Sequence, residues 1–239
     1  VAREFNLIAC FMSKPFMGVS ANGCHTNVSL WKGGELKSTP IGNKVLPGMD
    51  QVFTHISGGE NMFMPDPKID PVKPGPVGLH SIGGLLKHLP ALTCLGSPTV
   101  NSYRRLWDTG FWAPVYADWG YQNRTCSVRV SAPGRVEYRS VDSSHNPYLM
   151  GAGILNAFAD GLDNKIDPGE PEKKNIYDAM QEGKKVEKLP MTLGEAIERL
   201  DSDEIIKASL PEDMLRVFMH YKKDEWEKFL SAVTQWDVD

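Results

Sequence analysis

The hydrophobic residues follow two different spacings, which divide the chain into a strand-rich first part and a helical last third. Residues 5–13 form a short apolar run that predicts a buried strand. Residues 23–31 alternate between polar and apolar types, so His25, Asn27 and Ser29 are predicted to share one face of an extended segment. Further strands are predicted in three later segments: residues 113–118, 126–131 and 135–139.

Helical spacing begins at residues 76–95, which carry one apolar stripe. Glycine inside a helix costs ~1 kcal/mol relative to alanine. The pair Gly83-Gly84 therefore predicts close backbone packing against a neighbour. Asn146-Pro147 predicts the start of a second helix, because asparagine caps well and proline is tolerated at the first helical position. This helix is expected to run to about Asn164 and to turn four apolar residues inward: Ile154, Leu155, Phe158 and Leu162.

The remaining segments complete the predicted fold. Residues 32–75 are rich in Gly, Pro, Asp and Lys and predict an irregular excursion with one short helix near residues 51–56. Capping patterns begin at Thr192 and Ser209, and a last helix is expected over about residues 211–234. Strands in the middle and helices at the end predict an α+β fold with antiparallel strands, packed helices and a helical C-terminal third.

Composition excludes some classes of protein. The 239 residues carry a net charge of −4, which argues against a nucleic-acid partner, since such surfaces are normally basic. No apolar run approaches the ~20 residues that span a bilayer, and no secretory signal is visible, so the cytoplasm is the expected location. The four cysteines are expected to be free, buried thiols, and Cys126 to pack in an apolar layer with Val128 and Val130.

The charged strand around Glu137 is the most informative feature of the sequence. Alternation places Arg135, Glu137 and Arg139 on one face, and Val136 and Tyr138 on the other. A carboxylate offers hard oxygen to Mg²⁺ or Mn²⁺, and guanidinium groups bind phosphate or carboxylate through a planar fork. The alternative is a solvated strand face with a local salt bridge.

Other polar residues strengthen the interpretation as a site. If His25 lies beside Glu137, a divalent metal with mixed nitrogen and oxygen ligands is plausible, although a single histidine is more often structural. Arginines also concentrate in a short stretch with few acidic neighbours, which predicts either surface salt bridges or an anion pocket. They are Arg104, Arg105, Arg124, Arg129, Arg135 and Arg139.

Several motifs, in order along the chain, resemble the C-terminal part of the catalytic domain of glutamine synthetase and related glutamate–amine ligases. They are Phe11-Met12-Ser13-Lys14-Pro15, Gly23-Cys24-His25, Gly83-Gly84-Leu85-Leu86-Lys87-His88, Asn101-Ser102-Tyr103-Arg104-Arg105-Leu106, Asn123-Arg124, Arg135-Val136-Glu137-Tyr138-Arg139, Asn146-Pro147-Tyr148-Leu149 and Asn164-Lys165-Ile166-Asp167-Pro168-Gly169-Glu170. The resemblance implies an ATP-dependent ligase that phosphorylates the γ-carboxylate of glutamate and then joins it to ammonia or an amine, with Mg²⁺ or Mn²⁺ on the phosphates.

The resemblance also implies roles for individual residues. His25 and Glu137 resemble metal ligands, and Arg105 and Arg139 resemble the pair that binds glutamate. Arg124 is similar to the catalytic arginine that reaches the transferring phosphoryl group and contacts substrate and ATP. ATP contacts are further implied for four residues: Asn27, Ser29, Arg129 and Arg135.

The departures from the family pattern concern the acceptor. Asn27 replaces a second histidine, and Trp112 stands where a glutamine synthetase carries a glutamate that helps to deprotonate ammonium. An indole accepts no proton but contacts an alkylammonium through a cation–π interaction worth ~0.5–2 kcal/mol. This favours a small amine such as methylamine, as in a γ-glutamylmethylamide synthetase-like member. Ordinary ammonia use, space filling by Trp112, and a non-catalytic binding or assembly role remain alternatives.

The family's N-terminal β-grasp domain and the first strands that carry metal ligands have no counterpart in the sequence. Residues 1–239 are therefore expected to be the C-terminal portion of the catalytic domain, incomplete and inactive alone. The family also implies a homo-oligomer of stacked rings with active sites between subunits.

Overall fold

The centre of the computed structural model, which describes residues 1–40, 51–66, 68, 70–107 and 113–238, is a four-stranded sheet. β8 (Arg135–Tyr138) lies between β1 (Thr26–Val28) and β7 (Val128–Ala132), antiparallel to both. β6 (Trp119–Tyr121) continues the sheet parallel to β7. Because β8 has a neighbour on each side, its register fixes which residues of three strands lie side by side.

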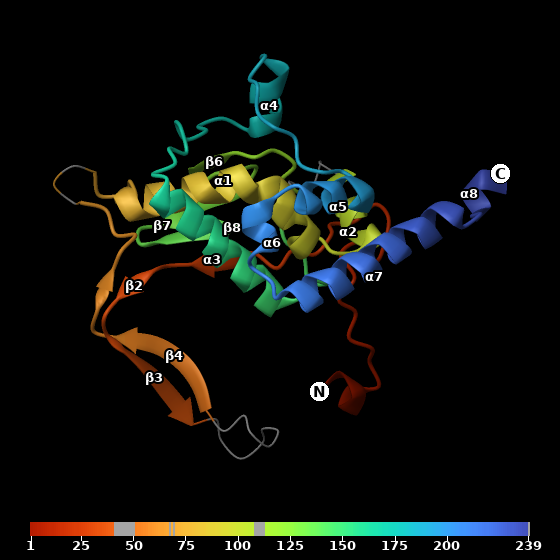
Figure 1. The fold of residues 1–239 in the computed structure, drawn as a ribbon, viewed down its shortest axis with the longest axis horizontal. Helices are drawn as coiled ribbons and strands as arrows, with labels where there is room; N and C mark the ends of the chain where they lie inside the picture. Colours follow the sequence, from red (N-terminus) through yellow and green to blue (C-terminus); the bar gives the residue numbers. More distant parts are fainter. Residues whose placement is uncertain (41–50, 67, 69, 108–112, 239) are drawn as a thin grey trace.

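Two smaller sheets lie along the excursion between β1 and the first helix. β2 (Trp31–Lys32) pairs with β5 (Glu60–Asn61), and β3 (Glu35–Pro40) pairs with β4 (Gln51–Ser57), in both cases antiparallel. The β3–β4 ribbon extends away from the body of the molecule (Figure 1).

Two long helices form the main layer against the sheet. α1 (Pro76–Gly96) contacts β7 and β8 and packs along α3 (Pro147–Asp163). Asn146 caps α3, accepting hydrogen bonds from the backbone N–H groups of Tyr148 and Leu149, as the sequence predicts. The other helices are a 3-10 turn at Ala2–Phe5, α2 (Val100–Trp107), α4 (Ile176–Gln181), α5 (Leu193–Asp201), α6 (Glu204–Lys207), α7 (Glu212–Ser231) and α8 (Gln235–Val238). The end of α7 and all of α8 extend away from the body of the molecule (Figure 1).

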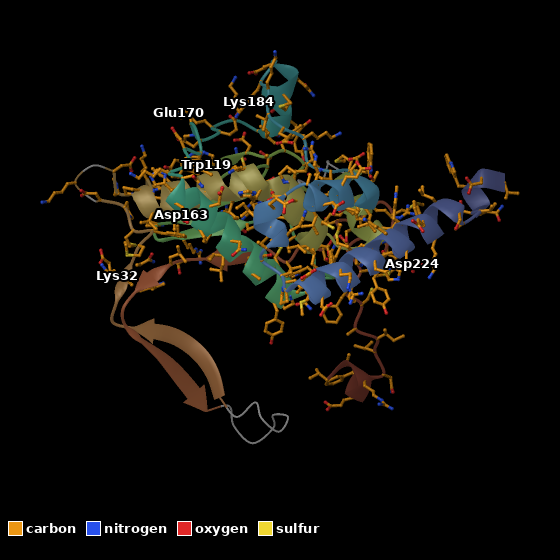
Figure 2. All side chains as sticks on the ribbon, in the orientation of Figure 1. Lys32, Trp119, Asp163, Glu170, Lys184 and Asp224 are labelled. Atoms are coloured by element: carbon orange, nitrogen blue, oxygen red, sulfur yellow. The ribbon has the colours of Figure 1, made fainter. Side chains whose placement is uncertain are left out.

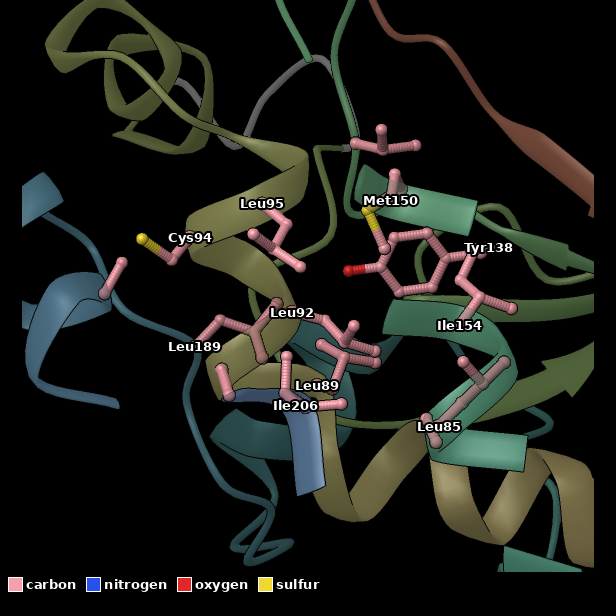
Figure 3. Close-up of a cluster of buried hydrophobic side chains, with 14 of the residues drawn as sticks. Leu85, Leu89, Leu92, Cys94, Leu95, Tyr138, Met150, Ile154, Leu189 and Ile206 are labelled. Carbon is pink, nitrogen blue, oxygen red and sulfur yellow. The ribbon is translucent and has the colours of Figure 1, made fainter. Parts of the chain in front are cut away.

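The core forms where the inner face of the sheet meets α1 and α3. Val136 and Tyr138 are fully buried, as is Val128 of β7. Figure 3 shows the Tyr138 ring beside Met150 and Ile154 of α3. Burying apolar area contributes about 25 cal/mol per Å², so this layer holds β8 firmly in place. The opposite face of β8 is left for polar side chains.

The predicted close approach of α1 to a neighbour is confirmed. A Cβ atom built at Gly84 would lie 1.9 Å from the carbonyl oxygen of Ala157 and 2.9 Å from the Gly161 backbone. One built at Gly83 would lie 2.3 Å from the carbonyl oxygen of Ile166. Only glycine lets the backbones of α1 and α3 approach so closely.

A buried histidine links three helices. Nδ1 of His88 lies 2.6 Å from Asp203, and its Nε2 lies 2.9 Å from Asp160. Lys87 also contacts Asp160, at 2.7 Å. Burial alone would lower the pKa of His88, but hydrogen bonds and charge from the two carboxylates outweigh burial and raise that pKa. Through these two carboxylates, the His88 side chain joins α1, α3 and the start of α6.

Lysine and tryptophan side chains attach the α4 region to the sheet edge. Lys184 contacts Asp118 at 2.8 Å and Glu172 at 2.5 Å. The indole of Trp119 donates to the carbonyl oxygens of Pro168 and Gly169. Figure 2 labels Trp119 and Lys184 on this side of the molecule. No helix in the described ranges combines the length and apolarity needed to cross a bilayer.

The α+β architecture and most helices are confirmed, whereas several local predictions are wrong. Residues 5–12 form an exposed segment after a 3-10 turn, because no strand among the described residues pairs with them. Residues 51–57 form strand β4, whose β-branched and aromatic residues suit a ladder better than a helix. Residues 113–118 contribute only an isolated bridge, and the strand begins at Trp119.

Smaller corrections concern single side chains. Thr192 caps α5 as predicted, but Ser209 does not cap α7, because its hydroxyl donates to the carbonyl of Ile206 instead. Leu155 is exposed rather than inward-facing. All four cysteines are free, and Cys126 is buried, but two of the four are exposed: Cys10 and Cys24.

The helix approach predicts opposite effects for two alanine substitutions. We expect Gly84→Ala to destabilise the protein by about 3 kcal/mol or more, because the methyl group meets backbone atoms that cannot move aside. Gly151→Ala in α3, where a methyl meets nothing within 4 Å, should stabilise it by up to about 1 kcal/mol. Urea unfolding measures both, and equal effects would contradict the packing described here.

The His88 link predicts a pH-dependent stability. A raised histidine pKa contributes stability below the unfolded value of ~6.5, and that contribution is lost as pH rises through the folded value. We therefore expect the free energy of unfolding to fall above neutral pH. In His88→Gln this dependence should disappear, with a loss of about 3 kcal/mol at pH ~6. The exposed control His220→Gln should keep the wild-type pH profile; a similar change in that control would refute the assignment to His88.

Candidate active site

The outer face of the sheet carries a row of polar residues that the strand register brings together. Asn27 pairs with Glu137, and Glu137 pairs with Arg129, so their side chains lie side by side on neighbouring strands. Val136 and Tyr138 point into the core, as the alternation predicts. The glutamate in the middle of this row is nevertheless only 7% exposed.

Three basic groups surround the Glu137 carboxylate. Arg129 Nη1 donates to Oε2 at 2.8 Å. Oε1 lies 3.2 Å from His25 Nδ1 and 3.5 Å from Arg139 Nη1. The structure thus brings His25 and Glu137 together across more than one hundred residues of chain, with two of the predicted arginines against them.

His25 reaches the carboxylate because its loop allows a close approach. A Cβ at Gly23 would lie 2.9 Å from the His25 ring nitrogen Nε2, and the Cys24 N–H donates to the carbonyl of Val141 at 3.1 Å. Burial lowers the pKa of His25 to about 4, helped by the charges of Arg139 and Arg105 and opposed by Glu137. The imidazole is therefore neutral near pH 7, the form that binds metals.

A buried chain of arginines continues from this point. Arg105 of α2 donates from Nη2 to the carbonyl of Arg139 at 3.1 Å, and Arg139 donates from Nη2 to the carbonyl of Arg124 at 2.8 Å. Burial lowers the pKa of both Arg105 and Arg139. Both remain cations, because an arginine is not deprotonated in proteins at neutral pH.

Among the described residues, three buried N–H groups of the arginines in this cluster have no hydrogen-bond partner. They are Arg105 Nη1, Arg129 Nε and Arg139 Nε. An unfilled buried donor costs about 1–3 kcal/mol, so such groups call for an explanation. Several cations against one carboxylate leave a surplus of positive charge. The arrangement suits an anionic ligand with several oxygen atoms, such as a phosphate or a carboxylate.

The donor atoms of His25 and Glu137 fit a shared divalent cation. Two ligands bound at roughly 2.1 Å and at right angles are separated by ~3 Å, close to the 3.2 Å between Nδ1 and Oε1. Within the described residues no cluster of three or more His, Cys, Asp or Glu could hold a metal. These two side chains would therefore supply part of a coordination shell.

The other predicted site residues lie at varying distances from this centre. The Arg124 side chain belongs to an exposed residue, and its backbone carbonyl accepts a hydrogen bond from Arg139. Arg135 is exposed at the start of β8. Asn27 is exposed beside Glu137, whereas the Ser29 hydroxyl accepts from the Trp31 indole at 2.9 Å. Trp112 lies outside the described residues. The functional roles of all these residues stay predictions.

Sequence analysis missed Gln122, which orients Arg129. Its Oε1 accepts from Arg129 Nη2 at 2.7 Å, and its Nε2 donates to the carbonyl of Ser131 at 2.5 Å. Gln122 has φ +51°, a left-handed conformation that is uncommon for residues other than glycine. The signal is absent from the sequence, because the contact depends on this backbone turn and on the parallel pairing of β6 with β7.

The ion-pair cluster predicts strong energetic coupling in the ligand-free protein. Glu137→Gln should destabilise it by about 3–5 kcal/mol, because it leaves buried guanidinium groups without a counter-charge. Adding Arg129→Met should recover part of that loss, so the double variant should be more stable than the sum of the single effects. Urea unfolding of the four proteins measures the coupling. Additive effects would contradict the pairing, and the exposed pair Lys174–Glu182 offers a control in which no coupling is expected.

Comparisons of the sequence with known proteins identify the family of the chain. The sequence model of the family described as "Glutamine synthetase, catalytic domain" matches residues 1–239. Glutamine synthetase of Pyrococcus furiosus is 38% identical over 258 aligned residues, covering 100% of this chain and 52% of that protein. Glutamine synthetase of Thermotoga maritima is 37% identical, covering 96% of this chain and 48% of that protein.

Solved structures give the same result. The structure of "Apo GmaS without ligand" superposes with a TM-score of 0.80 at 33% identity, covering 99% of this chain and 48% of that chain. The "GmaS/ADP complex-Conformation 1" has a TM-score of 0.81 at 32% identity, with 98% and 49% covered. The chain spans about half the length of these relatives. These matches show that the chain belongs to the glutamine synthetase catalytic-domain family.

Proposed function

We propose that this chain forms the C-terminal portion of the catalytic domain of an ATP-dependent ligase that joins the γ-carboxylate of glutamate to ammonia or a small amine. The observation that carries the proposal is the Glu137 cluster, where a neutral imidazole and a carboxylate lie beside arginines with unfilled buried donors. Phosphoryl transfer depends mainly on positioning and on neutralising charge, and this site offers the groups for both.

His25 and Glu137 would hold Mg²⁺ or Mn²⁺. When bound, such an ion neutralises phosphate oxygens and orients them for in-line transfer. The remaining ligands would come from the substrates and from protein outside this chain, which supports the proposal that the chain is incomplete as a catalyst alone. One related structure is a complex with ADP, which supports the proposal that this protein binds a nucleotide.

The arginines divide between two anions in the proposed reaction. Arg105 and Arg139 bind and orient glutamate, whose γ-carboxylate oxygen attacks the terminal phosphorus of ATP as ADP leaves. Arg124 is the proposed catalytic residue, stabilising the charge on the transferring group. Arg129 and Arg135 hold nucleotide phosphates, and Asn27 and Ser29 contact the nucleotide.

The second step forms the amide. An amine bound as an alkylammonium first loses one proton to a base. Its neutral nitrogen then attacks the acyl carbon of γ-glutamyl phosphate, phosphate leaves, and the nitrogen loses a second proton to the departing phosphate as the amide forms. Trp112 would face the incoming amine. The face of an indole attracts an alkylammonium cation, but the ring accepts no proton. Methylamine is therefore the favoured acceptor.

A second candidate is a ligase that uses ammonia, which the names of the curated relatives favour. A non-catalytic assembly protein is less well supported, because an unused site gives no physical reason for keeping several buried guanidiniums around one carboxylate. We further propose that the active protein is a homo-oligomer in the cytoplasm, with rings of subunits that complete each other's sites.

The activity is tested on the natural gene product expressed from its own start codon. We expect ADP and phosphate release that requires both glutamate and an amine, with methylamine preferred over ammonia. Glutamate-dependent release with ammonia only would favour the second candidate. Nucleotide binding with no release under any amine would favour the assembly protein and overturn the ligase.

The acceptor preference is tested through Trp112. We expect Trp112→Glu to shift the ratio of kcat/KM values from methylamine towards ammonia by about 2- to 30-fold, the range that a cation–π contact of ~0.5–2 kcal/mol supplies. Trp236→Glu, an exposed tryptophan near the chain end, serves as the control and should leave the ratio unchanged. An unchanged ratio in Trp112→Glu would remove Trp112 from the acceptor site.

A further inference from the structure

Arg129 compensates the negative charge of Glu137 that a divalent cation would need. Its Nη1 donates to Oε2 at 2.8 Å, the shortest contact of that carboxylate, while His25 and Arg139 approach Oε1 at 3.2 and 3.5 Å. A metal ion that binds this carboxylate meets a guanidinium with the same sign of charge on the neighbouring oxygen.

Arg129 is also the arginine of the cluster that is most free to leave. Arg139 is anchored to the backbone carbonyl of Arg124 at 2.8 Å, and its side chain is 7% exposed. The Arg129 side chain is 15% exposed and is held by two side chains, Glu137 and Gln122. Side-chain partners can be exchanged without moving a strand, whereas a backbone partner cannot.

An incoming phosphate offers Arg129 a better partner. Its Nε is buried and has no acceptor within the part of the chain that the structure describes, so the guanidinium lacks one hydrogen bond where it lies. A phosphate oxygen would fill that donor and would supply more negative charge than one carboxylate. When Arg129 turns to the phosphate, Glu137 regains an uncompensated negative charge, which favours a cation at Oε1 beside His25.

We propose that Arg129 is a positioning residue that exchanges between Glu137 and nucleotide phosphate, and so couples metal loading to nucleotide binding. Gln122 acts as the brace that keeps Arg129 on Glu137 until the nucleotide arrives. The inference rests on the proposed function, because it takes His25 and Glu137 as metal ligands. Because the exchange of Arg129 links the two sites, the metal and the nucleotide each tighten the binding of the other by the same factor.

Mn²⁺ titrations of the natural gene product test the exchange. Pulsed electron paramagnetic resonance counts the Mn²⁺ that carries a nitrogen coupling, the signature of an imidazole ligand and hence of the His25 site. Titrations are run with and without an ATP analogue that cannot transfer its phosphate. We expect the analogue to tighten this Mn²⁺ site in the wild type by roughly 5-fold or more.

Three variants separate exchange from general electrostatics. Arg129→Gln should bind Mn²⁺ alone more tightly than the wild type, and the gain from the analogue should shrink. Gln122→Met changes no charge but releases the brace, so it should also tighten binding of Mn²⁺ alone, by a smaller factor. Arg216→Gln removes the same charge from an exposed position on α7 and should leave the affinity for Mn²⁺ alone unchanged.

Each other result is decisive. Three results would overturn the exchange: equal or weaker binding of Mn²⁺ alone in Arg129→Gln, an unchanged affinity in Gln122→Met, or equal tightening in Arg216→Gln. If Arg129→Gln does not fold, Gln122→Met decides alone. Absence of any nitrogen-coupled Mn²⁺ in the wild type, with or without the analogue, would overturn the proposed metal site itself rather than the exchange only.

Discussion

A single buried carboxylate organises the candidate site. Glu137 lies on a strand with neighbours on both sides, so the sheet register decides which residues it meets. That register places Arg129 against it from β7 and Asn27 beside it from β1. A shift of the pairing by one residue would place the Glu137 carboxylate in the apolar core and expose the Tyr138 ring, and both changes would be unfavourable. The chemistry of the site therefore depends on backbone pairing as much as on charge.

The rest of the fold keeps that strand in place. Tyr138 is fully buried next to Glu137 and packs against α1 and α3. Those two helices approach each other through glycines, so the layer behind the sheet is thin and dense. Rigid support matters here, since like-charged guanidiniums around one carboxylate would otherwise separate. The stability of the core offsets the cost of burying donors that have no protein partner.

The sequence was most informative where a pattern reports a local constraint. The alternation around Glu137 correctly predicted the two faces of β8, and Gly83-Gly84 correctly predicted the helix contact. The prediction failed where pairing over long range decides the structure. Residues 5–12 have the composition of a strand but no strand partner among the described residues, and residues 51–57 form a strand by pairing with β3. Gln122 could not be found, because its role arises only from a left-handed turn.

A crystal structure of the natural gene product with Mn²⁺ and ADP would show directly whether His25 and Glu137 bind the metal, because anomalous scattering locates manganese without assuming its ligands. We expect a manganese peak at roughly 2.1 Å from both a His25 ring nitrogen and a Glu137 oxygen. We also expect the Arg129 guanidinium to have turned from Glu137 towards a phosphate oxygen. A manganese ion bound elsewhere, with Arg129 still paired to Glu137, would contradict both the metal site and the exchange of Arg129.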